Sequence, residues 1–88
     1  MKITMYGSTL CQDTLYALMK VKALGAEVDF HNITAVLPDL RAFMTLREED
    51  PVYANVGKER LGMPLFILED GTKTLDLDAV LERIRREN

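Results

Sequence analysis

The first part of the chain carries the pattern that most constrains its fold, which is a short apolar strand followed by a turn and a helix. Residues 2–6 (Lys-Ile-Thr-Met-Tyr) predict a buried strand, and residues 7–9 (Gly-Ser-Thr) predict a turn. A helix of about four turns is then expected from Cys11 to about Leu24. The only cysteine of the chain therefore stands where a strand gives way to a helix.

The residue pattern of this first helix predicts which of its faces is buried. Leu15, Leu18 and Met19 follow the i, i+3, i+4 spacing of an apolar face, and Val21 widens that face. Gly25 suits the end of the helix because glycine accepts a left-handed backbone conformation there. We expect the leucine face to pack against a sheet.

The rest of the chain predicts three more strands and two more helices. Residues 27–32 alternate polar and apolar side chains, which is typical of a strand near the edge of a sheet. Residues 64–68 and 72–75 flank an Asp-Gly turn and predict a hairpin. The helices are expected from Pro38 or Asp39 to about Glu49, with Leu40, Phe43 and Met44 on the inner face, and from a cap at Asp76 or Asp78 onward.

The predicted order of elements, β-α-β-α-β-β-α, indicates an α/β fold. The first β-α-β unit should give two parallel strands through a right-handed crossover, and the hairpin should add two antiparallel strands to the same sheet. We therefore expect a four-stranded mixed sheet with helices on both faces. At 88 residues, the chain is predicted to form one domain, residues 1–88, because it has no room for a second core.

Composition and charge exclude several classes of function. The net charge is −3 and no basic cluster is present, which argues against nucleic acid as a partner. No apolar run is long enough to span a membrane, and the chain begins without a signal-peptide pattern. One cysteine cannot form an internal disulfide, so any disulfide must join a second molecule. We expect a protein of the reducing cytoplasm, acting as a monomer.

The position of Cys11 suggests thiol chemistry. The first turn of a helix has unsatisfied N–H groups and a partial positive charge, which stabilise a thiolate placed there. The thiolate is the nucleophile in thiol–disulfide exchange. The alternative is that Cys11 is an inert, buried residue, since free cysteine often serves only in packing.

The order of elements, Cys11 after the first strand and Met63-Pro64 before the third, resembles the glutaredoxins of the thioredoxin fold. The resemblance covers essentially the whole chain and looks closest to small bacterial glutaredoxin-related proteins. It is carried by four further segments: Leu-Arg-Glu at residues 46–48, Asp-Pro-Val-Tyr at 50–53, Gly-Met-Pro-Leu-Phe at 62–66 and Leu-Glu-Asp-Gly at 68–71.

This resemblance implies an active site around Cys11. The family usually carries Cys-x-x-Cys, whereas this chain has Cys-Gln-Asp-Thr, so Thr14 replaces the resolving cysteine. Thr14 falls one helical turn after Cys11, and its hydroxyl could donate to the thiolate. The family also implies a cis peptide bond before Pro64. The backbone of Met63 would then pair with the cysteine of glutathione or of a substrate.

Further expected binding residues lie on both sides of this site. Ser8 stands where many glutaredoxins carry a lysine that holds the glutathione carboxylate. Before the last helix, Leu75 and Asp76 replace a Gly-Gly pair of the family. Asp76, Leu77 and Asp78 are expected near the γ-glutamyl group, with Asp78 as the best match for the aspartate that meets its amine.

These residues predict a monothiol thiol–disulfide oxidoreductase acting through Cys11. It would remove glutathione from glutathionylated proteins, with glutathione or another low-molecular-weight thiol as co-substrate and no bound cofactor. Arg47 could meet a glutathione carboxylate, although a solvated or salt-bridged arginine is the favoured interpretation, and Lys58 and Arg60 could add positive charge near the cleft. A lone histidine, His31, does not make a metal site. Two alternatives remain open: a binding module that has lost catalysis, or a redox sensor whose cysteine is reversibly capped.

Overall fold

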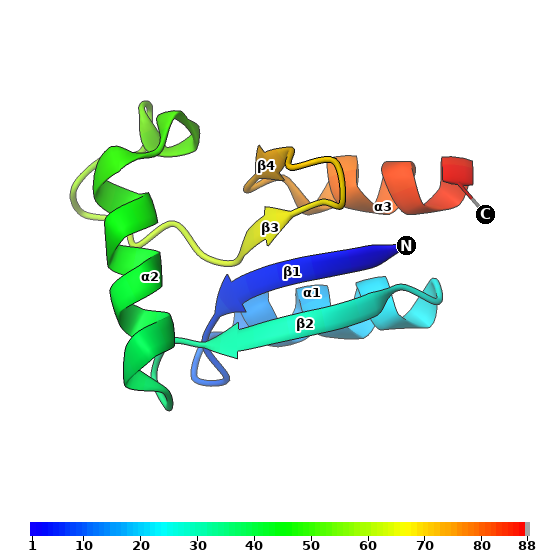
Figure 1. The fold of residues 1–88 in the computed structure, drawn as a ribbon. Helices are drawn as coiled ribbons and strands as arrows, with labels where there is room; N and C mark the ends of the chain where they lie inside the picture. The colour runs from blue at the N-terminus through cyan, green and yellow to red at the C-terminus, as the bar shows by residue number, and fades with distance from the viewer. Residues whose placement is uncertain (88) are drawn as a thin grey trace.

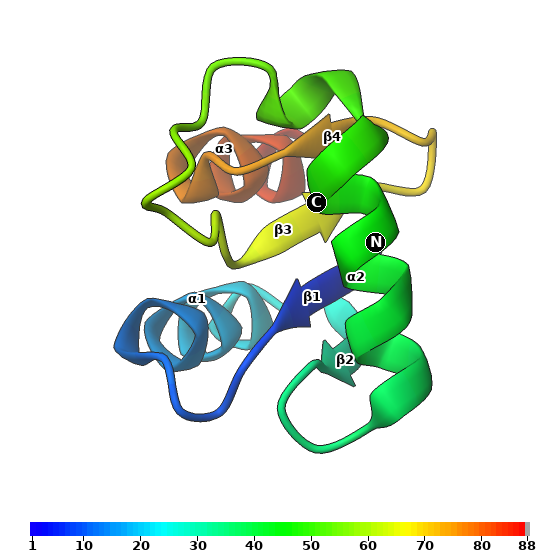
Figure 2. The ribbon, with the colours of Figure 1, turned by 90° about the vertical axis from the view of Figure 1, so that its left-hand side faces the viewer.

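The protein forms one mixed sheet with helices on both of its faces (Figures 1 and 2). A computed structural model describes residues 1–87 of the chain. Its elements are β1 (Lys2–Gly7), α1 (Gln12–Ala23), β2 (Glu27–Asn32), α2 (Leu37–Glu49), the 3-10 helix η1 (Pro51–Tyr53), β3 (Leu65–Ile67), β4 (Lys73–Thr74) and α3 (Leu77–Glu87). No helix in this part of the chain is both long and apolar enough to cross a membrane.

The four strands lie in the order β2-β1-β3-β4. β1 and β2 are parallel, with Ile3 opposite Val28, as the predicted crossover requires. β3 is antiparallel to both β1 and β4, so the hairpin joins the same sheet. The predicted mixed sheet and the edge position of residues 27–32 are therefore confirmed, although the two hairpin strands are shorter than expected.

Alternating residues of the central strands divide the apolar core into two halves. Ile3, Met5 and Phe66 face α1 and α3, where they pack with Val21 and Ile84. Tyr6, Leu65 and Ile67 face the opposite side, where they pack with Phe43 of α2 and with Tyr53 of η1. Figure 2 shows the sheet edge-on between α1 and α3 on one side and α2 on the other.

The buried face of α1 agrees with the prediction only in part: Val21 is buried and Leu18 packs against the core, but Leu15 and Met19 are exposed. The buried residues are Thr14, Ala17 and Val21, whereas Leu15 is 47% exposed and Met19 is 59% exposed. Small side chains let this helix approach the sheet closely: a Cβ atom added at Gly7 would lie 2.7 Å from Thr14 Cγ2. The spacing of apolar residues along a helix does not show how much space the sheet leaves for them. The prediction based on that spacing therefore included Leu15 and Met19 and missed Thr14 and Ala17.

The structure corrects one smaller prediction, on α2, and decides between the two candidate caps of α3. Met44 was expected on the inner face of α2 but is 50% exposed. Phe43 is the buried residue of that helix. Of the two candidate caps of α3, Asp76 is the one that caps: its Oδ1 accepts hydrogen bonds from the N–H groups of Asp78 and Ala79 at 3.0 and 3.3 Å.

Candidate functional site

Cys11 is the N-cap residue of α1, at the end of the turn that leaves β1. Its N–H donates to the carbonyl of Ser8 at 3.0 Å, and its carbonyl accepts from the N–H of Leu15 at 3.1 Å. The side chain is partly exposed and does not cap the helix itself. No side chain of the described residues caps the first N–H groups of α1, so they remain possible hydrogen-bond donors at this end of the helix.

The register of the sheet brings the Met63-Pro64 segment to the same end of the molecule as Cys11. Tyr6 pairs with Leu65, so the chain leaving β1 toward Cys11 and the chain entering β3 through Pro64 meet at one edge. The peptide bond between Met63 and Pro64 is cis. Cys11 and Pro64, although distant in sequence, thus both lie toward the carboxyl end of β1.

Tyr53 fixes the loop that precedes Met63. Its hydroxyl donates to the carbonyl of Gly62 at 2.6 Å. Gly62 has a φ of +75°, and a Cβ atom there would lie 2.5 Å from the Tyr53 ring. Burial raises the pKa of Tyr53 to about 12, so the phenol remains a hydrogen-bond donor at neutral pH.

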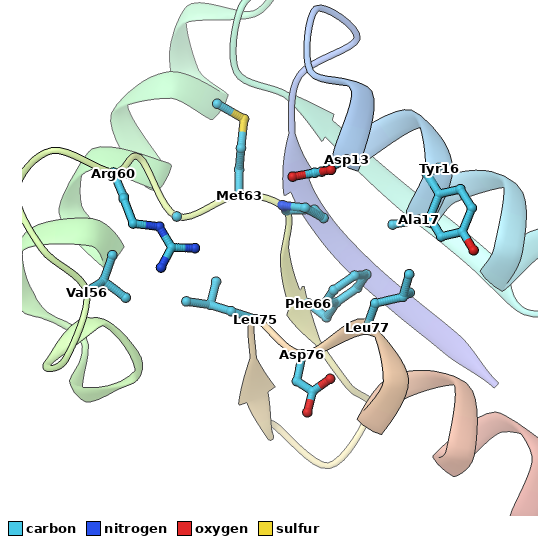
Figure 3. Close-up of a pocket in the computed structure, with 12 residues that line it drawn as sticks. Asp13, Tyr16, Ala17, Val56, Arg60, Met63, Phe66, Leu75, Asp76 and Leu77 are labelled. Atoms are coloured by element: carbon cyan, nitrogen blue, oxygen red, sulfur yellow. The ribbon is translucent and has the colours of Figure 1, made fainter.

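A cavity of about 490 Å³ opens beside these segments, between α1, the 60–64 loop and the start of α3 (Figure 3). Four of the predicted binding residues line it, namely Met63, Pro64, Asp76 and Leu77. The remaining lining residues are Asp13, Tyr16, Ala17, Val56, Arg60, Gly62, Phe66 and Leu75. The structure therefore brings together half of the residues predicted from the sequence.

The other predicted residues lie outside the lining of this cavity. Ser8 is 1% exposed, its hydroxyl shares a 2.7 Å hydrogen bond with that of Thr34, and it also accepts from the N–H of Leu10. It supports the turn and cannot reach a ligand, which corrects its predicted role. Asp78 is exposed on α3 and does not line the cavity, whereas Asp76 does.

Thr14 also has a role different from the predicted one. Its side chain is fully buried, and its Oγ1 accepts a 3.3 Å hydrogen bond from the N–H of Ser8. Within residues 1–87, no hydrogen bond joins Thr14 to the sulfur of Cys11. Thr14 therefore anchors the turn between β1 and α1, and it acts on Cys11 only through the position of that turn.

Three charged groups line the cavity. Asp13 lies in the first turn of α1, and Asp76 lies at the start of α3. The third is the guanidinium of Arg60, which Figure 3 shows directed into the space between Val56, Leu75 and Asp76. Among the side chains that the structure describes, neither Asp13 nor Arg60 has an ion-pair partner, so both charges are available to a ligand.

Arg47 holds the loop that carries Arg60. Its guanidinium donates to the carbonyls of Gly57 and Arg60, each at 2.8 Å, and lies 4.9 Å from the centre of the Tyr53 ring. The sequence suggested a ligand contact for Arg47, but these bonds make it a support for the loop. Neither Arg47 nor Tyr53 could be assigned this role from sequence, because their partners lie in an irregular segment.

A second cavity, of about 550 Å³, lies on the α2 side of Met63. Its lining is mostly apolar and includes Phe43, Met44 and Leu61. Met63 lines both cavities, so the two meet at the residue that precedes Pro64. No sequence pattern predicted this second cavity, because its lining comes from three separate segments.

His31 forms a polar cluster away from the sulfur. Its Nδ1 bonds to Asp39 at 2.8 Å and its Nε2 to Asp29 at 3.2 Å, while its ring stacks on Tyr6 at 4.6 Å. Burial lowers the pKa of His31, but the two carboxylates raise it by more, so the pKa lies above its usual 6.5. The described part of the chain holds no group of side chains suited to a metal ion.

Comparisons with known proteins place this chain in a family and a fold. No family model matches the sequence. An uncharacterized protein of Haemophilus influenzae is 33% identical over 76 residues, which cover 85% of this chain and 87% of that protein. The chain belongs to the family of that protein.

A solved structure, the glutaredoxin from Methanosarcina mazei Go1, is similar with a TM-score of 0.65 at 18% identity. The match covers 94% of this chain and 77% of the archaeal protein. The family member described here therefore has the thioredoxin fold in its glutaredoxin-like form, as its resemblance to glutaredoxins implied.

Proposed function

We propose that this protein is a glutaredoxin-like thiol–disulfide oxidoreductase that acts through Cys11 by a monothiol route. The observation that carries the proposal is the position of Cys11, a partly exposed N-cap residue two positions before Asp13, which lines the same cavity as Pro64 and Arg60. The glutaredoxin-like fold supports the same chemistry by analogy. Glutathione, or another low-molecular-weight thiol of a reducing cytoplasm, is the proposed co-substrate.

The cavity supports a small peptide thiol as a ligand. Arg60 offers a guanidinium to a carboxylate, and Asp76 offers a carboxylate to an ammonium group. Met63 precedes Pro64 at the cavity wall, and its backbone would pair with an extended peptide. In this proposal Asp76, rather than Asp78 as expected from the sequence, meets the amine of the γ-glutamyl group.

The experiment compares the wild-type protein with a Cys11→Ser variant. Serine is a favoured N-cap residue, so the variant should keep α1 and remain folded, which circular dichroism will check. Both proteins are assayed for reduction of hydroxyethyl disulfide by glutathione, and both are treated with glutathione disulfide and weighed by mass spectrometry. We expect turnover and one bound glutathione for the wild type, and neither for Cys11→Ser. Equal turnover by the two proteins would refute the role of Cys11.

One observation favours a second candidate function, that of a binding module. The apolar cavity between α2 and Leu61 adjoins Met63, and Leu61 and Met44 are both at least half exposed. A folded wild-type protein that reacts with neither hydroxyethyl disulfide nor glutathione disulfide would favour this candidate. A protein that forms the mixed disulfide but is not turned over by glutathione would instead favour a redox sensor.

A further inference from the structure

We propose that the site prefers disulfides that carry a positive charge beside the reacting sulfur, and that Asp13 sets this preference. The inference rests on the proposed function of Cys11 and concerns which substrates that cysteine accepts. The chemistry that would be recognised is an ammonium or guanidinium group, on a small aminothiol or on a lysine or arginine next to an oxidised cysteine.

The first argument is the position and freedom of Asp13. It lies two residues after Cys11, lines the cavity, and is exposed. Figure 3 shows its carboxylate directed across the mouth of the cavity toward Met63. Among residues 1–87, no basic side chain forms an ion pair with it, so a substrate bound next to Cys11 meets an uncompensated negative charge.

The second argument compares the charges near the sulfur. The start of α1 contributes about half a positive charge, whereas the carboxylate of Asp13 contributes a full negative one. The sum of these two charges, at the first turn of α1, is therefore negative. Asp76 adds a second carboxylate to the wall of the cavity, although its Oδ1 already accepts two backbone hydrogen bonds at the start of α3.

The third argument is the separation of opposite charges along the cavity. Arg60 comes from the loop beside Val56 and Leu75, away from the α1 wall that carries Asp13 (Figure 3). A ligand with a cation near its sulfur and an anion farther away would match this order. A ligand with a carboxylate beside its sulfur would meet repulsion from Asp13 before it reached Arg60.

The reaction that this preference controls is an ordinary thiol–disulfide exchange. The thiolate of Cys11 attacks one sulfur of the substrate, a new bond forms from Cys11 Sγ, and the substrate S–S bond breaks to release a thiolate that takes a proton from water. A low-molecular-weight thiol then attacks the mixed disulfide and releases Cys11. One half of the substrate thus leaves as a thiol and the other half as a disulfide with the small thiol. Attack on that disulfide by a second small thiol releases the second half, so that two small thiols are oxidised as the substrate disulfide is reduced.

The experiment measures rates of mixed-disulfide formation with cystamine, which is cationic, and with dithiodipropionate, which is anionic. The quantity of interest is the ratio of the two rates, compared between the wild type and Asp13→Asn. Because any change in the nucleophilicity of Cys11 alters both rates equally, the ratio reports only the charge preference. We expect the ratio to fall about tenfold at low salt, since a unit charge about 6 Å away in water changes each rate about threefold, in opposite directions.

Glu27→Gln is the matched control, because it also removes one negative charge. Glu27 begins β2, opposite Lys2 and at the far end of β1 from Cys11, so the ratio should stay at the wild-type value. The preference of the wild type should also shrink as ionic strength rises from about 0.01 M to 1 M, because the screening length falls from about 30 Å to about 3 Å.

The outcomes separate this inference from the proposed function. In one outcome, the wild type reacts with both disulfides and Asp13→Asn leaves the ratio of the two rates unchanged. That result would overturn the charge preference but not the proposed oxidoreductase function. No exchange with either disulfide would overturn both. Peptide disulfides with lysine or glutamate next to the cysteine form a second arm: a preference in peptides assigns a basic protein substrate, and one confined to cystamine assigns a small aminothiol.

Discussion

Replacing Thr14 tests whether this residue supports the turn or acts on the thiol. Thr14→Val keeps the shape of the side chain but removes the oxygen that accepts the N–H of Ser8. Both residues are essentially buried, at 0% and 1% exposure, so water cannot replace the lost acceptor. Thr14→Ser is the matched variant, because it keeps the oxygen and removes only the methyl group that packs against Gly7.

The expected magnitudes follow from these contacts. An unsatisfied buried N–H costs about 1–3 kcal/mol, and the 3.3 Å length of this bond places Thr14→Val in the lower half of that range. Thr14→Ser loses one buried methyl group, or about 1 kcal/mol. For a domain of this size, each kcal/mol lowers the melting temperature by about 4–8 °C. Urea unfolding followed by far-ultraviolet circular dichroism measures both variants, since the chain has no tryptophan.

A second readout on the same variants separates the two roles of Thr14. If its hydroxyl only supports the turn, the pH dependence of Cys11 alkylation in Thr14→Val should match the wild type. The reasoning would be refuted by a Thr14→Val protein as stable as the wild type. It would equally be refuted by slower alkylation of Cys11 in Thr14→Val but not in Thr14→Ser, since that result would place the hydroxyl on the thiolate.

Three further predictions concern other parts of the structure. His31 has a raised pKa in the folded state, so its contribution to stability should be complete below pH 6.5 and lost as the pH rises through the folded value; urea titrations from about pH 5 to pH 8 should show this loss in the wild type and not in His31→Gln. Gly62→Ala should lower the free energy of unfolding by clearly more than Gly25→Ala. Both glycines have positive φ, at +75° and +88°, but only at Gly62 would the added Cβ meet a ring, that of Tyr53. Equal losses of stability in urea unfolding would contradict this contact. Tyr53→Phe should cost about 1 kcal/mol through its lost bond to Gly62, and the wild-type phenol should ionise near pH 12 in an absorbance titration, with stability falling as the pH rises from 10 toward that value.

The order of the elements and the position of the nucleophile could be predicted from the sequence. Strand alternation in residues 27–32 and the Asp-Gly turn are local signals, and the structure contains both elements. The placement of Cys11 at the start of a helix depends only on residues within one turn of it. Met63 and Pro64 at the cavity wall followed from the family resemblance, which supplied a contact between distant segments.

Only the tertiary structure decided which side chains reach the site. The sequence could not show that Ser8 and Thr14 are buried, because their burial follows from the close approach of α1 to a glycine at the end of β1. It predicted positive charge from Arg60 near the cleft but could not show how that residue is held there, since the Arg47 and Tyr53 bonds that hold its loop join separate segments. Local patterns fix the period and the ends of an element, whereas the face that is buried depends on the volume its neighbours leave free.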